Sequence, residues 1–515
     1  MNGHAPAPGD YSDAALDRLT FRRQFILGTE LPETRPGWRR VAIDPRRRAD
    51  VHPDLEVCQA TSGRAVMTLL GYALDPHDPA ATNAVILLRL VDRLDRCHDI
   101  LGLTTDLGGR WALAVHDGER TILINDASGL RQVYYTTGGP AGEVVCASRP
   151  GLIAEFLGLS RDPAAVAYIR SRGLDDGEVY WLPGDTSIYA GVRVLLPNHL
   201  LDLGSGQATR FWPSADLLPV PRDEARAETV RLMQGQMDSA RRRWPLAIAM
   251  TAGWDSRLTL ALCRDAAPDL YAFTLLHPGG SDRSRDVAIP SALLPTLGIT
   301  HHVIRYPTAV HAALKAVHTR NSESANDAYG ADGQALYEAY PVDRVCVTGD
   351  VAEVVKCHFR KPVSAAGAVT ARDLAALCGQ APHPFLLAAF DRWLAGAEPR
   401  NLHLLDLFCW EQMGGRWQAH IRADFDIVHE SFAPLNCRRL LETMLGVDED
   451  DRRGPEFRFL WAVIERTWHE VLSVPINPPE PVSPGEVVGR TLRRFRVRRL
   501  IPSWAIALGK RLVRH

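Results

Sequence analysis

The second half of the chain alternates strand-length apolar runs with helical apolar faces. Residues 246–250 form a continuous apolar run as long as a buried parallel strand, and this run stops at the small and polar residues 251–256. After this turn the apolar side chains fall at helical spacing. Further strands are predicted at 270–276, 301–306 and 345–347, with a helix at 281–297. This alternation of strand, loop and helix predicts an α/β fold in which helices cover both faces of a parallel sheet.

The first half of the chain has a different pattern, which is rich in short strands. Residues 111–115 and 121–125 are predicted to be the two strands of a hairpin, and 144–148 a further strand. Residues 1–20 have the composition of a polar lead that contains prolines. We therefore expect a first domain of the α+β type at 21–212.

A proline-containing stretch separates the two halves. Residues 213–223 hold three prolines among residues of mixed polarity, which suits a linker, and 224–241 is predicted to be an amphipathic helix. Beyond the last predicted strand the apolar positions have helical spacing. We therefore expect a second domain at 224–478 with a helical C-terminal part, followed by a proline-rich linker and a basic tail at 479–515.

Composition narrows the class of protein. Of the 515 residues 46% are hydrophobic and 23% are charged, as in globular proteins, and a chain of this length exceeds one core. The formal net charge of -2 gives no overall attraction to nucleic acid. The nine cysteines form no Cys-x-x-Cys pair, which favours reduced thiols. The first twenty residues lack the apolar core of a secretory signal, and no apolar run is long enough to span a membrane, so we expect a cytoplasmic protein.

The last 26 residues are strongly basic. Residues 490–515 contain nine lysines and arginines and no acid, with apolar side chains between them. Such a segment can lie on an anionic membrane surface or dock on an acidic partner, and it can equally pack against its own domain. We expect peripheral contact of this tail with an anionic membrane or an acidic partner, and packing against its own domain is the alternative.

The turn after residues 246–250 has the features of a phosphate-binding loop. A strand that turns into a helix on small residues directs several backbone N–H groups and the positive end of the helix toward one spot. Ala252 and Gly253 are small, and Thr251 and Ser256 can add hydroxyl donors. Asp255 offers a hard oxygen ligand for a magnesium ion on phosphate oxygens. An ordinary strand-to-helix turn is the alternative.

A second set of polar residues follows the predicted strand 345–347. Gly349 and Asp350 come where that strand ends, at the edge where parallel sheets bind ligands, and Glu353 follows shortly after. Two acids beside phosphates repel them unless a metal ion lies between, so magnesium is expected here. Lys356 can offset further phosphate charge, or it can be a surface lysine.

Together the two loops resemble those of the asparagine synthetase family. The family's first loop is Ser-Gly-Gly-x-Asp-Ser, in which Thr251 and Ala252 take the first two positions of this chain. Its second loop is Thr-Gly-Glu-Gly-Ala-Asp-Glu, in which Asp350 replaces the first acid, Glu353 replaces the Asp, and Val354 replaces the last acid. Both loops occur in the family's order, about a hundred residues apart, which makes a chance match much less probable than for one loop.

The first domain resembles the N-terminal glutaminase-type domain of the same family, a class II glutamine amidotransferase domain. Glutaminases of this class use a cysteine directly after the initiator methionine, and the chain has Asn2 there. The nearest cysteine in sequence is Cys58. We therefore expect the domain to keep the fold without the glutaminase reaction. The residues that carry the resemblance are Gly109, Trp111, Ala112, Asp126, Gly129, Arg131, Tyr134 and Tyr135.

The resemblance also assigns roles outside the two loops. By likeness, Phe273, Thr274 and Leu275 would border the nucleotide base. The family has a Lys-Tyr pair where this chain has Arg458 and Phe459. Arginine can balance developing negative charge but does not easily transfer a proton, so the role implied for Arg458 is electrostatic. An exposed helix arginine is the alternative.

The resemblance implies ATP-dependent, adenylate-forming amide-bond synthesis that releases AMP and pyrophosphate, as in asparagine synthetase, the β-lactam synthetases and the lasso-peptide cyclases. ATP and Mg2+ are the implied cofactors, and the substrates would be a small-molecule or peptide carboxylate and an amine. Two alternatives stay open: a non-catalytic nucleotide-binding relative, and another ATP-pyrophosphatase enzyme such as a nucleotidyl or sulfur transferase. The candidate catalytic residues are Arg458, Glu353 and Lys356, the nucleotide-binding residues Thr251, Ala252, Gly253, Asp255, Ser256, Leu275, Gly349 and Asp350, and the magnesium ligands Asp255 and Glu353.

Overall fold

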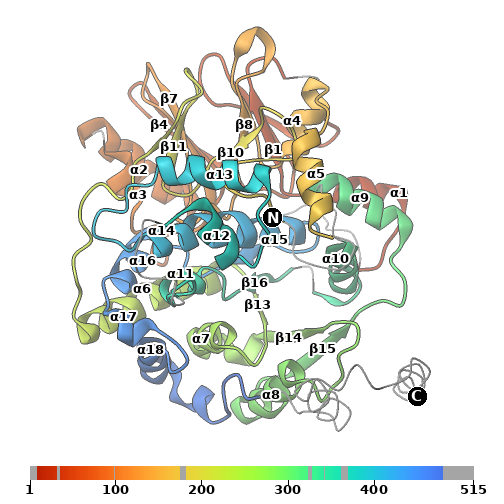
Figure 1. Cartoon of the computed structure of the whole chain (residues 1–515), viewed down its shortest axis with the longest axis vertical. Coiled ribbons are helices and arrows are strands. Elements are labelled where there is room, and N and C mark those ends of the chain that lie inside the picture. The colour runs from red at the N-terminus through yellow and green to blue at the C-terminus, as the bar shows by residue number, and fades with distance from the viewer. Residues whose placement is uncertain are drawn as a thin grey trace.

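Two antiparallel six-stranded sheets form the first half of the protein (Figure 1). The computed structural model describes residues 8–31, 35–97, 99–173, 181–322, 327–341, 343–360 and 369–479. One sheet has the strand order β10-β8-β9-β1-β3-β2 and the other the order β12-β11-β7-β6-β5-β4. The strands are β1 Phe25–Gly28, β2 Arg39–Ala42, β3 Arg48–Val51, β4 Val57–Ser62, β5 Ala65–Leu74, β6 Gly108–His116, β7 Thr121–Asn125, β8 Tyr134–Thr136, β9 Val145–Ala147, β10 Arg193–Val194, β11 His199–Asp202 and β12 Ala208–Arg210.

Side chains along β6 alternate between two cores, because successive residues of a strand point to opposite faces. Ala112 and Ala114 pack in the core between the two sheets. Leu113 and Val115 pack on the other face, in the core that includes residues of helix α2. Helix α4 contacts β8 and β9 of the other sheet. The first half is therefore a sandwich of two sheets with helices outside, as the α+β expectation requires.

A five-stranded parallel sheet organises the second half, in the order β15-β14-β13-β16-β17. One face buries Ala247 and Phe273 with side chains of α1, α9 and α10. The other buries Ile248 and Val347 with side chains of α7 and α18. The expected α/β class is confirmed, with helices on both faces of a parallel sheet. Its strands are β13 Leu246–Ala249, β14 Tyr271–Leu276, β15 His301–Arg305, β16 Val345–Val347 and β17 Ser431–Phe432.

The helices include the long α6 that leads into the parallel sheet and a helical C-terminal part (Figure 1). None of the described helices has both the length and the apolar character that crossing a membrane requires. The basic tail at 490–515 lies outside the described residues. The helices are α1 Asp13–Leu19, α2 Asn83–Cys97, α3 Ile100–Thr104, α4 Pro150–Leu157, α5 Pro163–Ser171, α6 Arg222–Arg243, α7 Trp254–Leu262, α8 Arg285–Leu293, α9 Ala312–Ser322, α10 Asp327–Ala339, α11 Ala352–Val355, α12 Ala371–Leu377, α13 Pro384–Ala395, α14 Leu404–Phe408, α15 Ala419–Phe425, α16 Arg438–Leu445, α17 Glu449–Arg452 and α18 Arg458–Trp468.

Two local predictions need correction. The supposed polar lead contains helix α1, whose Leu16 and Leu19 are buried against the parallel sheet. Its apolar face is short, because α1 has only seven residues, so its pattern is weak in the sequence. Residues Cys409–Gln418, expected to continue an α-helix, form a π-helix between α14 and α15. Such π segments are rare and often occur at functional sites.

Buried arginines of the first half bind carboxylates of the second half. Arg110 Nη1 and Arg131 Nη2 lie 2.8 and 2.7 Å from the two carboxylate oxygens of Glu430. Arg110 Nη2 also donates to Asp426 at 2.8 Å. Burial raises the pKa of Glu430, but the charges of Arg131 and Arg110 outweigh burial and hold that pKa well below its ordinary value. The carboxylate is therefore ionised and held between the two halves.

A second buried pair joins the same two halves. Arg149, which precedes α4, donates from Nη2 to Asp424 of α15 at 2.7 Å, and both side chains are inaccessible to solvent or nearly so. Arg149 also donates to the backbone carbonyls of Asn321 and Ser322. The guanidinium thus ties two segments of the second half, α15 and the end of α9, to the sandwich.

Substitution of Arg149 tests how much this contact stabilises the fold. Arg149→Met leaves Asp424 buried without its cation, and we expect the free energy of unfolding to fall by about 3–5 kcal/mol, measured by chemical denaturation. The double variant Arg149→Met/Asp424→Leu should recover part of the loss, because it removes the buried carboxyl that has lost its partner. Arg231→Met is the control, since Arg231 pairs with Glu228 on the half-exposed face of α6 and should contribute less than about 1 kcal/mol. Equal effects of Arg149→Met and Arg231→Met would contradict this account.

Candidate functional site

The turn between β13 and α7 is held in shape by its own side chains and by one from α8. Asp286 of α8 accepts a hydrogen bond from the backbone N–H of Ala252 at 3.0 Å. Thr251 Oγ1 accepts from the N–H of Gly253 at 3.2 Å and lies 3.1 Å from Ser256 Oγ. Gly253 caps α7 without a side-chain hydrogen bond, so no side chain competes for the amides at the start of this helix. These amides and the positive helix end are suited to a phosphate.

The hydroxyl of Ser256 is used inside the loop. Ser256 Oγ lies 3.0 Å from the carbonyl of Thr251 and 3.2 Å from that of Gly253, and the side chain is buried. Thr251 is exposed. The geometry therefore suits Thr251 better than Ser256 as a hydroxyl donor to a ligand, whereas both were predicted to donate.

A segment near the end of the described chain lies on this loop, which the sequence did not predict. The N–H of Asn477 donates to the carbonyl of Ala252 at 2.8 Å. Arg257, which has no solvent exposure, donates from Nη1 to the carbonyls of Val471 and Val474 at 2.6 and 2.7 Å. One feature of the sequence could have indicated this contact: Arg257 is a charged residue at a position of α7 where the helical spacing predicts an apolar one. Arg257 therefore positions the C-terminal segment against the loop of residues 251–256, the phosphate-type loop.

The second loop approaches the first at Gly349. A Cβ atom on Gly349 would lie 2.6 Å from Asp255 Cβ, so only glycine allows this approach. Thr348 Oγ1 donates to Asp350 at 2.6 Å, and Arg422 Nε lies 3.1 Å from the same carboxylate. Val351 has a φ of 75°, a strained conformation for a β-branched residue. The two predicted loops therefore lie side by side at the carboxyl edge of the sheet.

Three of the predicted residues form one charged cluster. Lys356 Nζ lies 2.7 and 2.8 Å from the two oxygens of Asp255 and 3.3 Å from Glu353 Oε1. Gln418, the last residue of the π-helix, donates from Nε2 to Glu353 at 2.6 Å and accepts the N–H of Val351 at 2.8 Å. Gln418 was not among the predicted residues, because nothing in the sequence ties it to the loop. One amide thus orients both the strained backbone and an acid of the site.

Burial and charge set the protonation of this cluster. Burial and the charge of Glu353 raise the pKa of Asp255 against the opposing effect of Lys356. Burial also opposes ionisation of Glu353, but Lys356 outweighs it and lowers the pKa of Glu353. Burial disfavours the charged lysine, yet the two carboxylates raise the pKa of Lys356, so the ammonium persists. The cluster contains two acids and one lysine, so its net charge is negative when both acids are ionised.

The donor set of the cluster fits a magnesium ion. Magnesium usually binds through one or two carboxylates together with water and substrate phosphates, and Asp255 and Glu353 offer that number of hard oxygen ligands. In the described part of the chain no group of three or more His, Cys, Asp or Glu side chains converges on a metal position. Lys356 lies on the same carboxylate oxygens. A metal ion would therefore share these carboxylates with the lysine or displace it.

The structure does not bring Arg458 to this cluster. Its side chain is 58% exposed, donates to the carbonyl of Asp450 at 3.0 Å and lies 3.4 Å from Asp451 of α17. Its neighbour Phe457 is closer to the site, with its ring centroid 6.0 Å from Lys356 Nζ and 5.4 Å from the ring of Trp254. Leu275 lies half-buried near the end of β14, the strand next to β13. The predicted site therefore assembles around its two loops and without Arg458.

The fold and site define an α/β protein in which a sandwich of antiparallel sheets is joined to a parallel sheet with a phosphate-type loop. No family model matches the sequence, and no curated protein does. Among solved structures, the glutamine-dependent NAD+ synthetase from Acinetobacter baumannii in complex with ADP is 17% identical over 38% of this chain and 43% of its own, with a TM-score of 0.20.

Two further solved structures are similar over parts of the chain. NMN synthetase from Francisella tularensis is 14% identical over 35% of this chain and 96% of its own, with a TM-score of 0.19. Glutamine phosphoribosylpyrophosphate amidotransferase from B. subtilis, in complex with ADP and GMP, is 11% identical over 60% of this chain and 90% of its own, with a TM-score of 0.20. Likeness at this level identifies neither the family nor the reaction.

Removal of the lysine tests the electrostatic account of the cluster. In Lys356→Met the two carboxyls lose their cation, which raises the pKa of both in the folded state. A carboxyl whose pKa is raised on folding stabilises the fold at low pH, and this contribution is lost as the pH rises through the folded pKa. We therefore expect the thermal midpoint of Lys356→Met to fall further below wild type at pH 8 than at pH 5. Adding Asp255→Asn should remove most of this pH dependence, and a pH-independent difference would refute the account.

Proposed function

We propose that the protein is an ATP-dependent ligase that forms a carbon–nitrogen bond through an acyl-adenylate and releases AMP and pyrophosphate. The observation that carries this proposal is the cluster of Asp255, Glu353 and Lys356. This cluster lies between the phosphate-type loop and the loop of residues 348–354, the acidic loop. Both loops follow parallel strands at their carboxyl ends, where α/β sheets bind nucleotides. The resemblance of these loops to those of asparagine synthetases supports the same chemistry.

The chain's own residues have distinct parts in this reaction. The amides at the start of α7, with Thr251, bind the departing phosphates. Asp255 and Glu353 would hold magnesium, which neutralises charge on the triphosphate when it is bound. Lys356, already charged in the cluster, adds a cation close to the same phosphates. The loops hold the nucleotide so that a substrate carboxylate can reach its α-phosphate, and an amine then attacks the activated acyl carbon. An electrostatic contribution by Arg458 stays a prediction.

We also propose that the first half has no glutaminase activity. A nucleophilic cysteine needs a lowered pKa, because the thiolate is the reactive form. The eight cysteines whose side chains the structure describes are half-buried or buried, and burial raises the pKa of each, including Cys58. The amine would then be free ammonia or a group on the substrate itself, as in the β-lactam synthetases and lasso-peptide cyclases.

A non-catalytic nucleotide-binding protein is the second candidate. The position of Lys356 favours it, because the lysine already binds both oxygens of Asp255, which magnesium would otherwise use. Val354 in place of the family's last acid points in the same direction. Such a protein would bind ATP without releasing pyrophosphate.

Substitution of Asp255 tests the ligase proposal. Asp255→Asn keeps the shape of the side chain but removes a metal ligand, so pyrophosphate release with ATP, magnesium and a carboxylate substrate should fall at least about a hundredfold. Magnesium should also strengthen ATP binding to wild type and not to the variant. Asp282→Asn is the control, because Asp282 is exposed and pairs with Arg305 near the same sheet edge. Undiminished pyrophosphate release by Asp255→Asn would refute the assignment, and ATP binding without turnover would favour the second candidate.

Incubation with glutamine tests the amidotransferase part. We expect the purified protein to form no glutamate from glutamine, with or without ATP, because its described thiols have raised pKa values. The measurement is glutamate formed per unit of protein, with heat-inactivated protein as the control. Glutamate that increases in proportion to active protein would contradict the proposal.

A further inference from the structure

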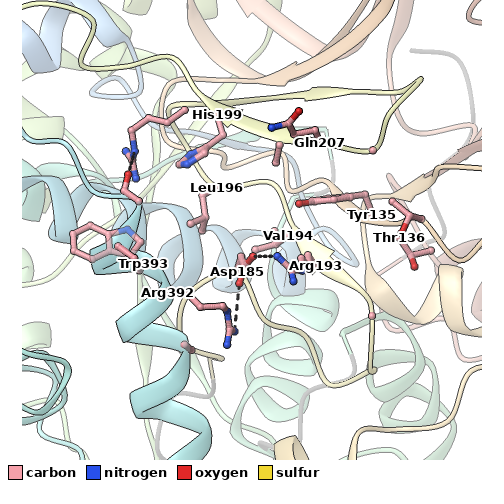
Figure 2. A pocket seen from close by; sticks show the side chains of 18 residues that line it. Tyr135, Thr136, Asp185, Arg193, Val194, Leu196, His199, Gln207, Arg392 and Trp393 are labelled. Carbon is pink, nitrogen blue, oxygen red and sulfur yellow. Dashed lines mark hydrogen bonds and ion pairs between the residues drawn. The ribbon is translucent and has the colours of Figure 1, made fainter.

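A cavity lies between the sandwich and helix α13, on residues that do not include the phosphate-type loop. Its volume is about 620 Å³, and it is lined by β8, β10, β11 and β12 on one side and by α13 on the other (Figure 2). Cavities of this size bind small organic molecules. Because both halves of the chain form its walls, a bound molecule would contact both.

The charges that line the cavity leave one positive charge in excess. Arg193 Nη1 lies 3.2 Å and Arg392 Nη2 3.7 Å from the carboxylate of Asp185. One carboxylate therefore serves two guanidinium groups, which are each more than half exposed. Arg210 adds no excess, because its Nη2 donates at 2.8 Å to Glu411, whose side chain is completely buried. A guanidinium has five N–H donors in a planar fork, so the two arginines together can bind one further carboxylate.

Two neutral polar groups stand beside this charge. Tyr135 extends from β8 with its hydroxyl turned into the cavity (Figure 2), and burial raises its pKa to about 12, so it stays a donor. His199 Nδ1 lies 2.8 Å from the carbonyl of Pro197, and burial lowers the pKa of His199. The neutral ring donates from Nδ1 to this carbonyl, which leaves Nε2 as an acceptor. The cavity therefore offers donors for an anion and an acceptor for a hydroxyl or amine.

The remaining walls are partly apolar, with Thr136, Thr137 and Gln207 as their polar side chains. Leu196 and Val194 come from the sandwich, and Ala389 and Trp393 come from α13. Trp393 is fixed in place, because its Nε1 donates to Glu411 at 2.7 Å. An aromatic wall with an apolar floor suits a ligand whose body is apolar and whose anionic group is at one end.

We propose that this cavity binds a small organic carboxylate with an apolar body, with the carboxylate between Arg193 and Arg392. A carboxylate matches the single excess positive charge, whereas a phosphate monoester carries about −1.5 to −2 at neutral pH and would leave negative charge uncompensated. The ligand joins the sandwich to α13, so it stabilises the association of the two halves by mass action. This binding site is independent of the proposed ligase reaction.

Calorimetric titration with benzoate tests the proposal. We expect saturable binding to the full-length protein with a Kd on the order of 1 mM, as a ligand of this size allows, and a higher thermal midpoint in its presence. Benzamide has the same shape without the charge and should bind at least tenfold more weakly. Phenyl phosphate should bind more weakly than benzoate, and ATP binding should not change when benzoate is present.

Variants of the two arginines locate the site. Arg193→Gln/Arg392→Gln should weaken benzoate binding at least tenfold and leave ATP binding as in wild type, because both side chains are on the surface and outside the loops. Arg89→Gln is the control, since Arg89 is similarly exposed but lies between two carboxylates, those of Asp75 and Asp78, and so has no positive charge in excess. Unchanged affinity in the double variant, equal affinity for benzamide, or no binding of benzoate would overturn the proposal. Tighter binding of phenyl phosphate would overturn the assignment to carboxylates.

Discussion

Charge pairing between the two halves is the contact on which the geometry of the site depends. Arg110 and Arg131 of the sandwich hold Glu430, which directly precedes β17. Strand β17 pairs with β16, and the acidic loop begins where β16 ends. Since removing one partner from a buried ion pair is costly, β17 is held firmly in place. The sandwich therefore helps to fix the position of the acidic loop through β17 and β16, whether or not the sandwich itself catalyses a reaction.

Much of the fold follows from the period of the apolar residues, and the remainder depends on contacts between distant segments. Runs such as 246–250 predicted the parallel sheet, and small residues with hydroxyls and acids marked both loops. The sequence did not reveal that Lys356 binds Asp255, because that contact requires the close approach at Gly349. Nor did it reveal that Arg458, the first residue of α18, turns toward Asp451 of α17, because a motif alignment gives no direction for a side chain. Helix α1 was missed, since only its burial against the sheet distinguishes it from a polar lead.

The two binding regions have opposite charge surpluses. The cluster around Asp255 and Glu353 has two acids for one lysine, so it favours a cation shared with phosphates. The cavity around Asp185 has two arginines for one acid, so it favours an anion. In both places the uncompensated charge is partly accessible to solvent, where retaining it costs less than in the core. A structural ion pair of equal charge, such as Arg149 with Asp424, has no such surplus and attracts no ligand.

The π-helix at Cys409–Gln418 makes the site sensitive to the length of the chain as well as to its residues. Gln418 reaches Val351 and Glu353 because this segment is wound more loosely than an α-helix. Deleting one residue from the segment without a change in its winding would turn the residues of the segment that follow by roughly a quarter of a turn around the axis. The glutamine would then face away from the acidic loop although its identity was unchanged. In evolution, an insertion or deletion here would alter the site without replacing any of the residues that form it.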